Sequence, residues 1–157
     1  EILATLPVRK TEVLAAKYLA ALTFVVIMLL PTLSYPFFIS TLGDLDWGPV
    51  WGGYIGAILL ASAYCGIGIM ASSISRNQII AVITSFIICF LLFMIDKMNI
   101  LYFIPGWLIN FFQYLGMDYH FRSISRGLLD SRDILYFLTV TYLSLHAAWL
   151  ILKEKND

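Results

Sequence analysis

Charged residues are scarce in this sequence and absent from long parts of it. Asp, Glu, Lys and Arg make up 13% of the chain, whereas soluble domains contain about 25%. Long uncharged runs include residues 18–43, 47–75, 77–95 and 134–152. A helix needs about 20 apolar residues to cross the hydrocarbon core of a bilayer, and each run has roughly that length. The sequence therefore excludes an ordinary soluble domain and indicates an integral membrane protein.

The motifs of nucleotide hydrolysis and of metal-dependent chemistry are missing as well. No GxxxxGK(S/T) phosphate-binding loop occurs, so the chain is not expected to hydrolyse ATP itself. It also lacks an HExxH motif, and no pair of carboxylates lies within an apolar span. We therefore predict no catalytic residue, no metal and no cofactor in this chain. Ion-driven carriers use buried carboxylates along their path, so the sequence disfavours an ion-driven carrier.

Cysteine is rare, and the net charge is zero. Cys65 and Cys89 both lie inside uncharged runs, with no other Cys or His at ligand spacing. We interpret them as small packing residues rather than as a disulfide or a metal site. The basic and acidic residues balance, so the charge does not point to nucleic acid. The lipid bilayer is the expected surrounding.

What the sequence does contain is a pattern of apolar helices in a single membrane domain, residues 1–157. We predict an all-α integral membrane fold with four transmembrane helices at 13–38, 50–73, 79–95 and 134–152. Thr11 is a plausible N-cap of the first helix. Pro31 and Pro36 are expected to kink or break that helix near its far end.

Small residues recur at helical spacing in the second predicted span. Gly52 and Gly56 are four residues apart, and such pairs allow helix backbones to approach closely in lipid. We expect this pair to pack against a helix of the same subunit. An interface with a second subunit is the alternative.

Residues 100–116 are apolar, but this segment is short and contains Pro105 and Asn110. Such segments are often re-entrant or interfacial rather than spanning, and we expect the region 100–130 to form a short helical pair of this kind. The distribution of Lys and Arg favours the other topology. If 100–116 crosses the membrane, the basic residues are divided more unevenly between the two sides, as the positive-inside rule favours. The residues alone leave both topologies open.

A short amphipathic helix is predicted after this segment. Asp118 is a good N-cap, and Phe121, Ile124 and Leu128 would share one face. Arg122 and Arg126 would stack four residues apart on another face. These two arginines could bind lipid phosphates or an anionic substrate. The alternative is that they form a solvated charged face.

Two segments resemble a known family. The opening EILATLPVRKTEVLAAKYLAAL resembles the cytoplasmic turn of type-2 ABC exporter permeases, where an apolar run and a Pro precede a basic patch and a long span. The later run GMDYHFRSISRGLLDSRDILYF is similar to the signature segment of the gliding-motility-associated branch of that family. The first pattern is shared widely among these permeases, and the second is long and more specific.

The resemblance implies the C-terminal part of a permease with six spans, of which this chain would hold the last four. It also favours four spans here over five. Residues 1–12 would be a cytoplasmic coupling segment that contacts a separate ABC ATPase subunit, which would bind ATP and Mg. The implied contact residues are Glu1, Ile2, Leu3, Leu6, Pro7, Arg9 and Lys10. The region 100–130 would lie on the outer face.

The implied function is that of the permease subunit of an ATP-driven exporter, working with a second permease subunit. Its location would be the bacterial cytoplasmic (inner) membrane, as a multi-pass protein with both ends of this chain in the cytoplasm. Because the chain begins at Glu1 rather than at Met, we expect it to come from a longer protein. The alternatives are a membrane-embedded lipid-modifying enzyme, which would need a cluster of Asp or His at one membrane depth, and a membrane anchor subunit that transports nothing.

Overall fold

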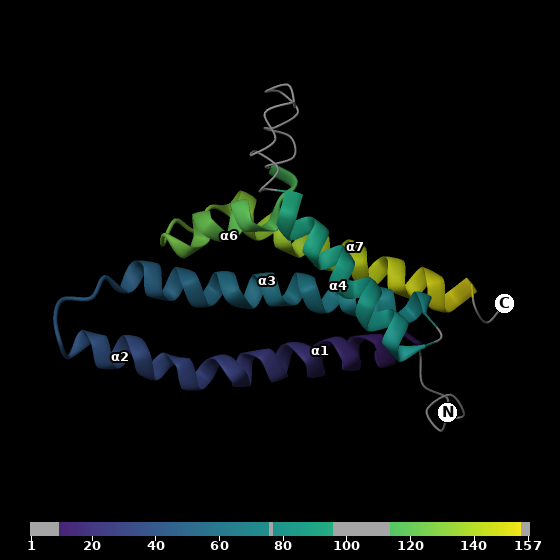
Figure 1. Ribbon diagram of the computed structural model, residues 1–157, viewed down its shortest axis with the longest axis horizontal. Coiled ribbons are helices and arrows are strands. Elements are labelled where there is room, and N and C mark those ends of the chain that lie inside the picture. Colours follow the sequence, from purple (N-terminus) through teal and green to yellow (C-terminus); the bar gives the residue numbers. More distant parts are fainter. Residues whose placement is uncertain (1–9, 76, 96–113, 155–157) are drawn as a thin grey trace.

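The computed structural model describes residues 10–75, 77–95 and 114–154, and every regular element in these ranges is helical (Figure 1). The elements are α1 (Lys10–Leu29), the 3-10 helix η2 (Leu30–Leu33), α2 (Ser34–Ser40), α3 (Trp47–Ile74), α4 (Gln78–Ile95), α6 (Met117–Ser125) and α7 (Ser131–Glu154). Residues 1–9, which belong to the predicted coupling segment, lie outside the described residues. The same is true of most of the predicted re-entrant or interfacial segment 100–116.

Four helical units in the described residues are long and apolar enough to cross a membrane: Thr11–Ser40, Trp47–Ile74, Gln78–Ile95 and Ser131–Glu154. This confirms the prediction of an all-α integral membrane fold, and the four predicted spans all occur within the described residues. The 28 residues of α3 correspond to about 42 Å of helix, which exceeds the hydrocarbon thickness of about 30 Å. We infer that α3 tilts or projects beyond the hydrocarbon.

The first span is interrupted where its prolines stand. α1 ends at Leu29, and Pro31 occupies the start of η2. Pro36 lies in the first turn of α2, where a missing N–H removes no helical hydrogen bond. The hydroxyl groups of Thr32 and Tyr54 are 2.9 Å apart and tie this break to α3. Thr11, which we expected to be an N-cap, lies within α1 instead.

α3 is the central helix, and α7 runs parallel to it. The hydroxyl groups of Ser62 on α3 and Thr141 on α7 lie 3.2 Å apart. One turn further along both helices, a Cβ at Gly66 would lie 3.3 Å from Cβ of Ser144. Small side chains and shared hydroxyl hydrogen bonds are how helices associate in lipid, because burial of apolar area contributes little there.

The two ends of the described chain lie at the same end of the bundle (Figure 1). A small cavity there is lined by Leu14 of α1, Ser73 of α3 and Leu152 of α7. At the opposite end, Thr32 and Pro36 line a cavity together with Gly53 of α3. α1 is therefore antiparallel to α3, and the chain returns to its starting side.

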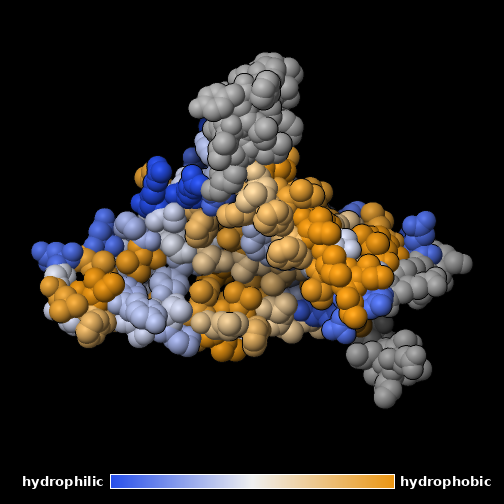
Figure 2. Space-filling view, viewed as in Figure 1, coloured by the Kyte–Doolittle hydropathy of each residue, from blue (hydrophilic) through white to orange (hydrophobic). Residues whose placement is uncertain are grey.

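The outer surfaces of the bundle are strongly apolar. α4 buries few of its residues, and Figure 2 shows hydrophobic residues covering it. Among these, Ile79, Val82, Phe86 and Phe90 are exposed. The buried core forms where α3, α6 and α7 meet, and consists of Ala63, Ile67, Met117, Ile124 and Phe137. Such a division places lipid around the bundle and the packed contacts inside it.

Candidate functional site

The short helix α6 lies on the N-terminal half of α3, on a surface made by two glycines (Figure 1). A Cβ at Gly52 would overlap the carbonyl oxygen of Ile124. A Cβ at Gly56 would lie 3.2 Å from Cγ2 of Ile124 and 3.3 Å from the ring of Phe121. The two glycines therefore allow the backbone of α6 to approach α3 as closely as it does.

A tight turn follows α6 and fixes its position. The helix ends at Ser125, and Gly127 has a φ of +83°, the left-handed conformation that glycine adopts without steric cost. A Cβ at Gly127 would lie 2.9 Å from the carbonyl carbon of Gly48 at the start of α3. Both the conformation and the space at this position therefore require glycine.

Two details of the predicted amphipathic helix are wrong. The N-cap is Gly116, and Asp118 lies in the first turn, where its Oδ2 accepts a hydrogen bond from Arg122 at 2.6 Å. Leu128 does not share a helical face with Ile124, because it follows the turn at Gly127 and is exposed. The helix ends early because the chain must turn against α3.

The buried face of α6 carries a histidine that is fully enclosed. His120 lies between Met117 and Ile124 on that face, and all three side chains are buried. Its Nδ1 is 2.6 Å from Oδ1 of Asp133, in the first turn of α7. Its Nε2 is 2.8 Å from the carbonyl oxygen of Tyr114. His120 thus connects α6 to α7 and to the chain that precedes α6.

The partners of His120 are both hydrogen-bond acceptors. The carbonyl oxygen of Tyr114 has no proton to donate, and the Asp133 carboxylate has none while it is ionised. Breaking such a buried pair from one side costs about 3–5 kcal/mol where an uncompensated charge remains.

Aromatic rings complete the surroundings of His120. The ring of Tyr136 is stacked on the imidazole with a centroid distance of 4.0 Å and an interplanar angle of 21°. The hydroxyl of Tyr136 donates to the carbonyl oxygen of Leu115 at 2.5 Å. Tyr114 and Tyr119 meet the imidazole edge-on at 4.9 and 5.4 Å. Stacking and edge-on contacts of this kind hold the ring in one orientation.

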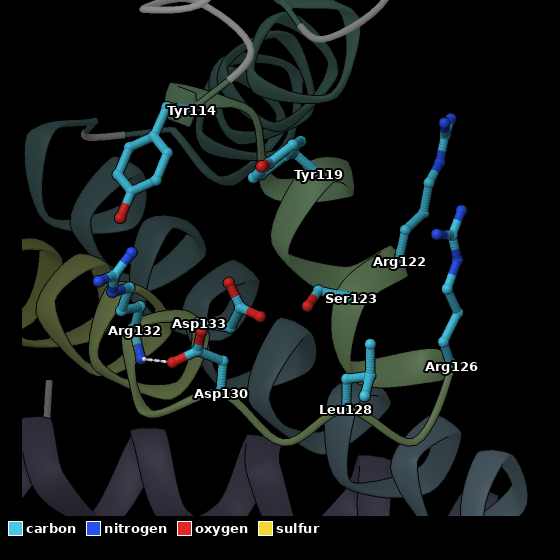
Figure 3. Close-up of a pocket in the computed structure, with 9 residues that line it drawn as sticks. All are labelled: Tyr114, Tyr119, Arg122, Ser123, Arg126, Leu128, Asp130, Arg132 and Asp133. Carbon is cyan, nitrogen blue, oxygen red and sulfur yellow. Dashed lines mark hydrogen bonds between the residues drawn. The ribbon is translucent and has the colours of Figure 1, made fainter.

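A pocket of about 400 Å³ opens beside this cluster, between α6 and the start of α7 (Figure 3). Arg122 and Arg126 lie on one flank and Arg132 on the other, with Asp130 and Asp133 between them. Oδ2 of Asp133 is buried and has no hydrogen-bond partner among the described residues. An unsatisfied buried acceptor costs about 1–3 kcal/mol, so the pocket contains an unused binding group.

The sequence matches the family described as ABC-2 family transporter protein over residues 1–151. The chain belongs to this family. No curated protein matches the sequence at significance, and no solved structure does. Membership of the ABC-2 family agrees with the resemblance of the opening segment to type-2 ABC permeases, and describes the chain as a membrane permease of an ABC transporter.

The structure of this ABC-2 family protein locates some of the predicted site residues. Gly52 and Gly56 contact α6 rather than another spanning helix. Arg122 and Arg126 both line the pocket, and both are exposed. The predicted coupling residues Glu1, Ile2, Leu3, Leu6, Pro7 and Arg9 lie outside the described residues, and Lys10 is the first residue of α1.

Sequence reasoning missed His120 and Asp133. Asp133 reads as part of a turn before the last span, although it lies in the first turn of α7 and is buried. A signal for His120 was present, because Met117, His120 and Ile124 recur at helical spacing on the apolar face of α6. A histidine on such a face needs buried hydrogen-bond partners.

His146 lies within the last span, in α7. Its ring neighbours in the structure are Tyr142 and Trp149, at 6.0 and 5.8 Å, and both belong to α7 itself. Cys65 and Cys89 are both free and half-buried. The described residues contain no cluster of three or more His, Cys, Asp or Glu side chains that could hold a metal ion.

Proposed function

We propose that this chain is part of the permease subunit of an ATP-driven ABC exporter, and that it moves substrate by conformational coupling to a separate ATPase subunit. The match to the ABC-2 family over residues 1–151 carries this proposal. The four apolar helices supply the membrane-spanning part. The sequence has no phosphate-binding loop, so ATP and Mg would be bound by the partner.

The contact with the ATPase would be made by residues 1–10. Ile2, Leu3 and Leu6 form an apolar stripe that ends at Pro7, beside the basic residues Arg9 and Lys10. This segment directly precedes α1, whose first turns line a small cavity together with the ends of α3 and α7. A push on the segment would therefore reach three helices at once, which is the arrangement that transmission of force requires.

The packing of the bundle suggests how such a push would act. α3, α6 and α7 share the buried core and the His120–Asp133 pair. α1 and α4 bury little of their surface. We infer that the first group moves as one rigid body, while α1 and α4 shift against it or against a second permease subunit, homologous or identical.

The membrane and the orientation follow from the same proposal. A bacterial inner membrane with both ends of the chain in the cytoplasm would place residues 1–10 beside a cytoplasmic ATPase. The pocket between α6 and α7 would then open toward the outer side. The run from Gly116 to Phe137, which resembles the gliding-motility-associated signature, supports assignment to that branch.

The geometry gives little support to the rival function of a lipid-modifying enzyme. His120, the one histidine beside the pocket within the described residues, is fully buried and uses both ring nitrogens in hydrogen bonds. A general acid or base must reach the proton that it transfers, and this imidazole is held away from any substrate. The second rival, a membrane anchor subunit, is distinguished from an exporter permease by the experiment described next.

The test is co-purification of the full-length permease with the ABC ATPase that is expressed with it, followed by ATPase assays in lipid vesicles. We expect a stable complex whose ATP hydrolysis is faster than that of the ATPase alone. An anchor would bind without changing turnover. A lipid-modifying enzyme would act on lipid in the absence of the ATPase, and that result would overturn the proposal.

A further inference from the structure

The pocket between α6 and α7 presents charges of both signs in a defined arrangement. Arg126 and Arg132 lie on opposite flanks, and the carboxyl groups of Asp130 and Asp133 lie between them (Figure 3). Neither arginine has an ion-pair partner within the described part of the chain. Arg122, on the same flank as Arg126, is held by Asp118. A ligand for this pocket would therefore carry a cationic group next to an anionic one.

Asp133 determines the chemistry of the cationic group. Its side chain is only 8% exposed, and its Oδ1 is bonded to His120. Its Oδ2 is buried and has no hydrogen-bond partner in the described residues, and Asp133 is one of the residues that line the pocket (Figure 3). A buried carboxylate oxygen binds best to a group that donates N–H bonds and carries positive charge. A primary ammonium meets both requirements, whereas a quaternary ammonium has no N–H to donate.

The arginines determine the chemistry of the anionic group. Guanidinium groups bind phosphate through paired N–H donors. Asp130 is engaged at Oδ1 by the backbone N–H of Arg132, which fixes the start of α7 and the position from which the Arg132 side chain leaves. A ligand that offers a phosphate to Arg126 or Arg132 and an ammonium to Asp133 has the chemistry of phosphoethanolamine.

The position of the pocket along α7 indicates the source of the ligand. Arg132 and Asp133 are the last charged residues before the uncharged run 134–152, which forms most of the span. The mouth of the pocket is therefore at the depth where lipid headgroups lie. A volume of about 400 Å³ accommodates a headgroup, and the acyl chains would extend along the apolar surface of the bundle.

We propose that the pocket between α6 and the start of α7 binds a headgroup with a primary ammonium next to a phosphate, the chemistry of phosphatidylethanolamine. The ammonium bonds Oδ2 of Asp133, and the phosphate bonds Arg126 or Arg132. This inference concerns binding alone, and it does not require that the chain transports lipid or that an ATPase drives it.

The test uses the full-length permease in nanodiscs of phosphatidylcholine that contain a small fraction of a second phospholipid. Native mass spectrometry then measures which lipids stay bound. We expect preferential retention of phosphatidylethanolamine over its N,N,N-trimethylated equivalent, phosphatidylcholine, and over phosphatidylglycerol, which has no ammonium. Retention of phosphatidylethanolamine no greater than its fraction in the nanodisc would overturn the proposal, as would a preference for phosphatidylglycerol.

Substitutions locate the site. Asp133→Asn should weaken retention of phosphatidylethanolamine about tenfold, since a charge-assisted hydrogen bond is lost. Because Asp133 also holds His120, its substitution disturbs the fold as well, and a second variant leaves this pair intact. Arg126→Gln combined with Arg132→Gln changes two exposed side chains and should reduce retention similarly. Lys17→Gln with Lys153→Gln, at the other end of the bundle, is the matched control. Equal effects of the two double variants would overturn the proposal.

Soluble headgroups distinguish a lipid from a free ligand of the same chemistry. O-phosphoethanolamine should compete with phosphatidylethanolamine in the nanodisc assay, and phosphocholine should not. Competition at micromolar concentration would assign the site to a soluble phosphoethanolamine group. Competition only at millimolar concentration would assign it to the lipid, whose acyl chains add affinity. Equal competition by both compounds would contradict the role of Asp133.

Discussion

Gly52 of α3 lies directly against the carbonyl oxygen of Ile124 of α6, at a distance that leaves no space for a Cβ. Gly53, the next residue, has no atom within 4 Å of the position that its Cβ would take. The two neighbouring glycines therefore differ in function. One determines how closely α6 approaches α3, and the other occupies open space on the helix.

This difference predicts opposite effects of the same substitution. Gly52→Ala should destabilise the protein by about 2 kcal/mol, because backbone atoms of α6 must move to accommodate the methyl group. Gly53→Ala should be neutral or stabilise it by up to about 1 kcal/mol, as alanine favours the helix. The measurement is the midpoint of thermal unfolding of the full-length permease in detergent. Equal midpoints for the two variants would mean that α6 does not dock on Gly52.

The His120–Asp133 pair gives a second prediction. His120→Leu should destabilise the fold by about 3–5 kcal/mol, because it leaves the Asp133 carboxylate buried without its partner. Adding Asp133→Asn should recover part of the loss, since the charge is then removed. His146→Leu is the control, as the ring neighbours of His146 among the described residues, Tyr142 and Trp149, belong to α7 itself. Strictly additive losses in denaturation assays would show that the two residues are not coupled.

The spans of this protein were predictable because they depend on one physical requirement. A charged side chain at the centre of a bilayer is costly, so uncharged runs such as 77–95 reveal a span without knowledge of its neighbours. Pro31 likewise marks the break after α1, because a proline beyond the first turn of a helix removes a hydrogen bond. Both are properties of local sequence.

The site was predictable only in part, because it depends on tertiary contacts. Gly52 and Gly56 indicated a close approach, but their partner is the short helix α6, which lies more than sixty residues later in the chain. His120 and Asp133 lie on different helices with a turn at Gly127 between them. Their pairing depends on how that turn directs the chain, and no spacing rule contains this information.

The arrangement of the helices predicts which loops share a side of the membrane. Thr41 follows α2, Leu129 precedes α7, and Asn77 lies between α3 and α4. In a background with Cys65 and Cys89 replaced by Ala, Thr41→Cys and Leu129→Cys should react with an impermeant maleimide from one face of sealed vesicles. Asn77→Cys and Glu154→Cys should react from the other. Labelling of Leu129→Cys together with Asn77→Cys would show that residues 96–113 cross the membrane.

The last prediction concerns the contact with the ATPase, in the segment that precedes α1. Leu3→Asp combined with Leu6→Asp places two charges on the apolar stripe. Removal of interface anchors commonly costs over about 2 kcal/mol, so affinity for the ATPase should fall more than about tenfold. Ala4→Asp with Thr5→Asp adds the same charge away from the stripe and should have a smaller effect. Pull-down of the ATPase with the full-length permease provides the measurement.

Arg9→Glu distinguishes an anchor from a peripheral charge at the same contact. Charges at the rim of an interface mainly change the rate of association, so this variant should slow binding and weaken the slowing of binding by added salt, while ATP turnover at saturation stays unchanged. The double aspartate variant should lose stimulated turnover even at saturating ATPase, because the helices of the bundle no longer receive the push. Full binding and full turnover in that variant would show that residues 1–9 do not couple the two subunits, and the exporter proposal would then rest on membership of the ABC-2 family alone.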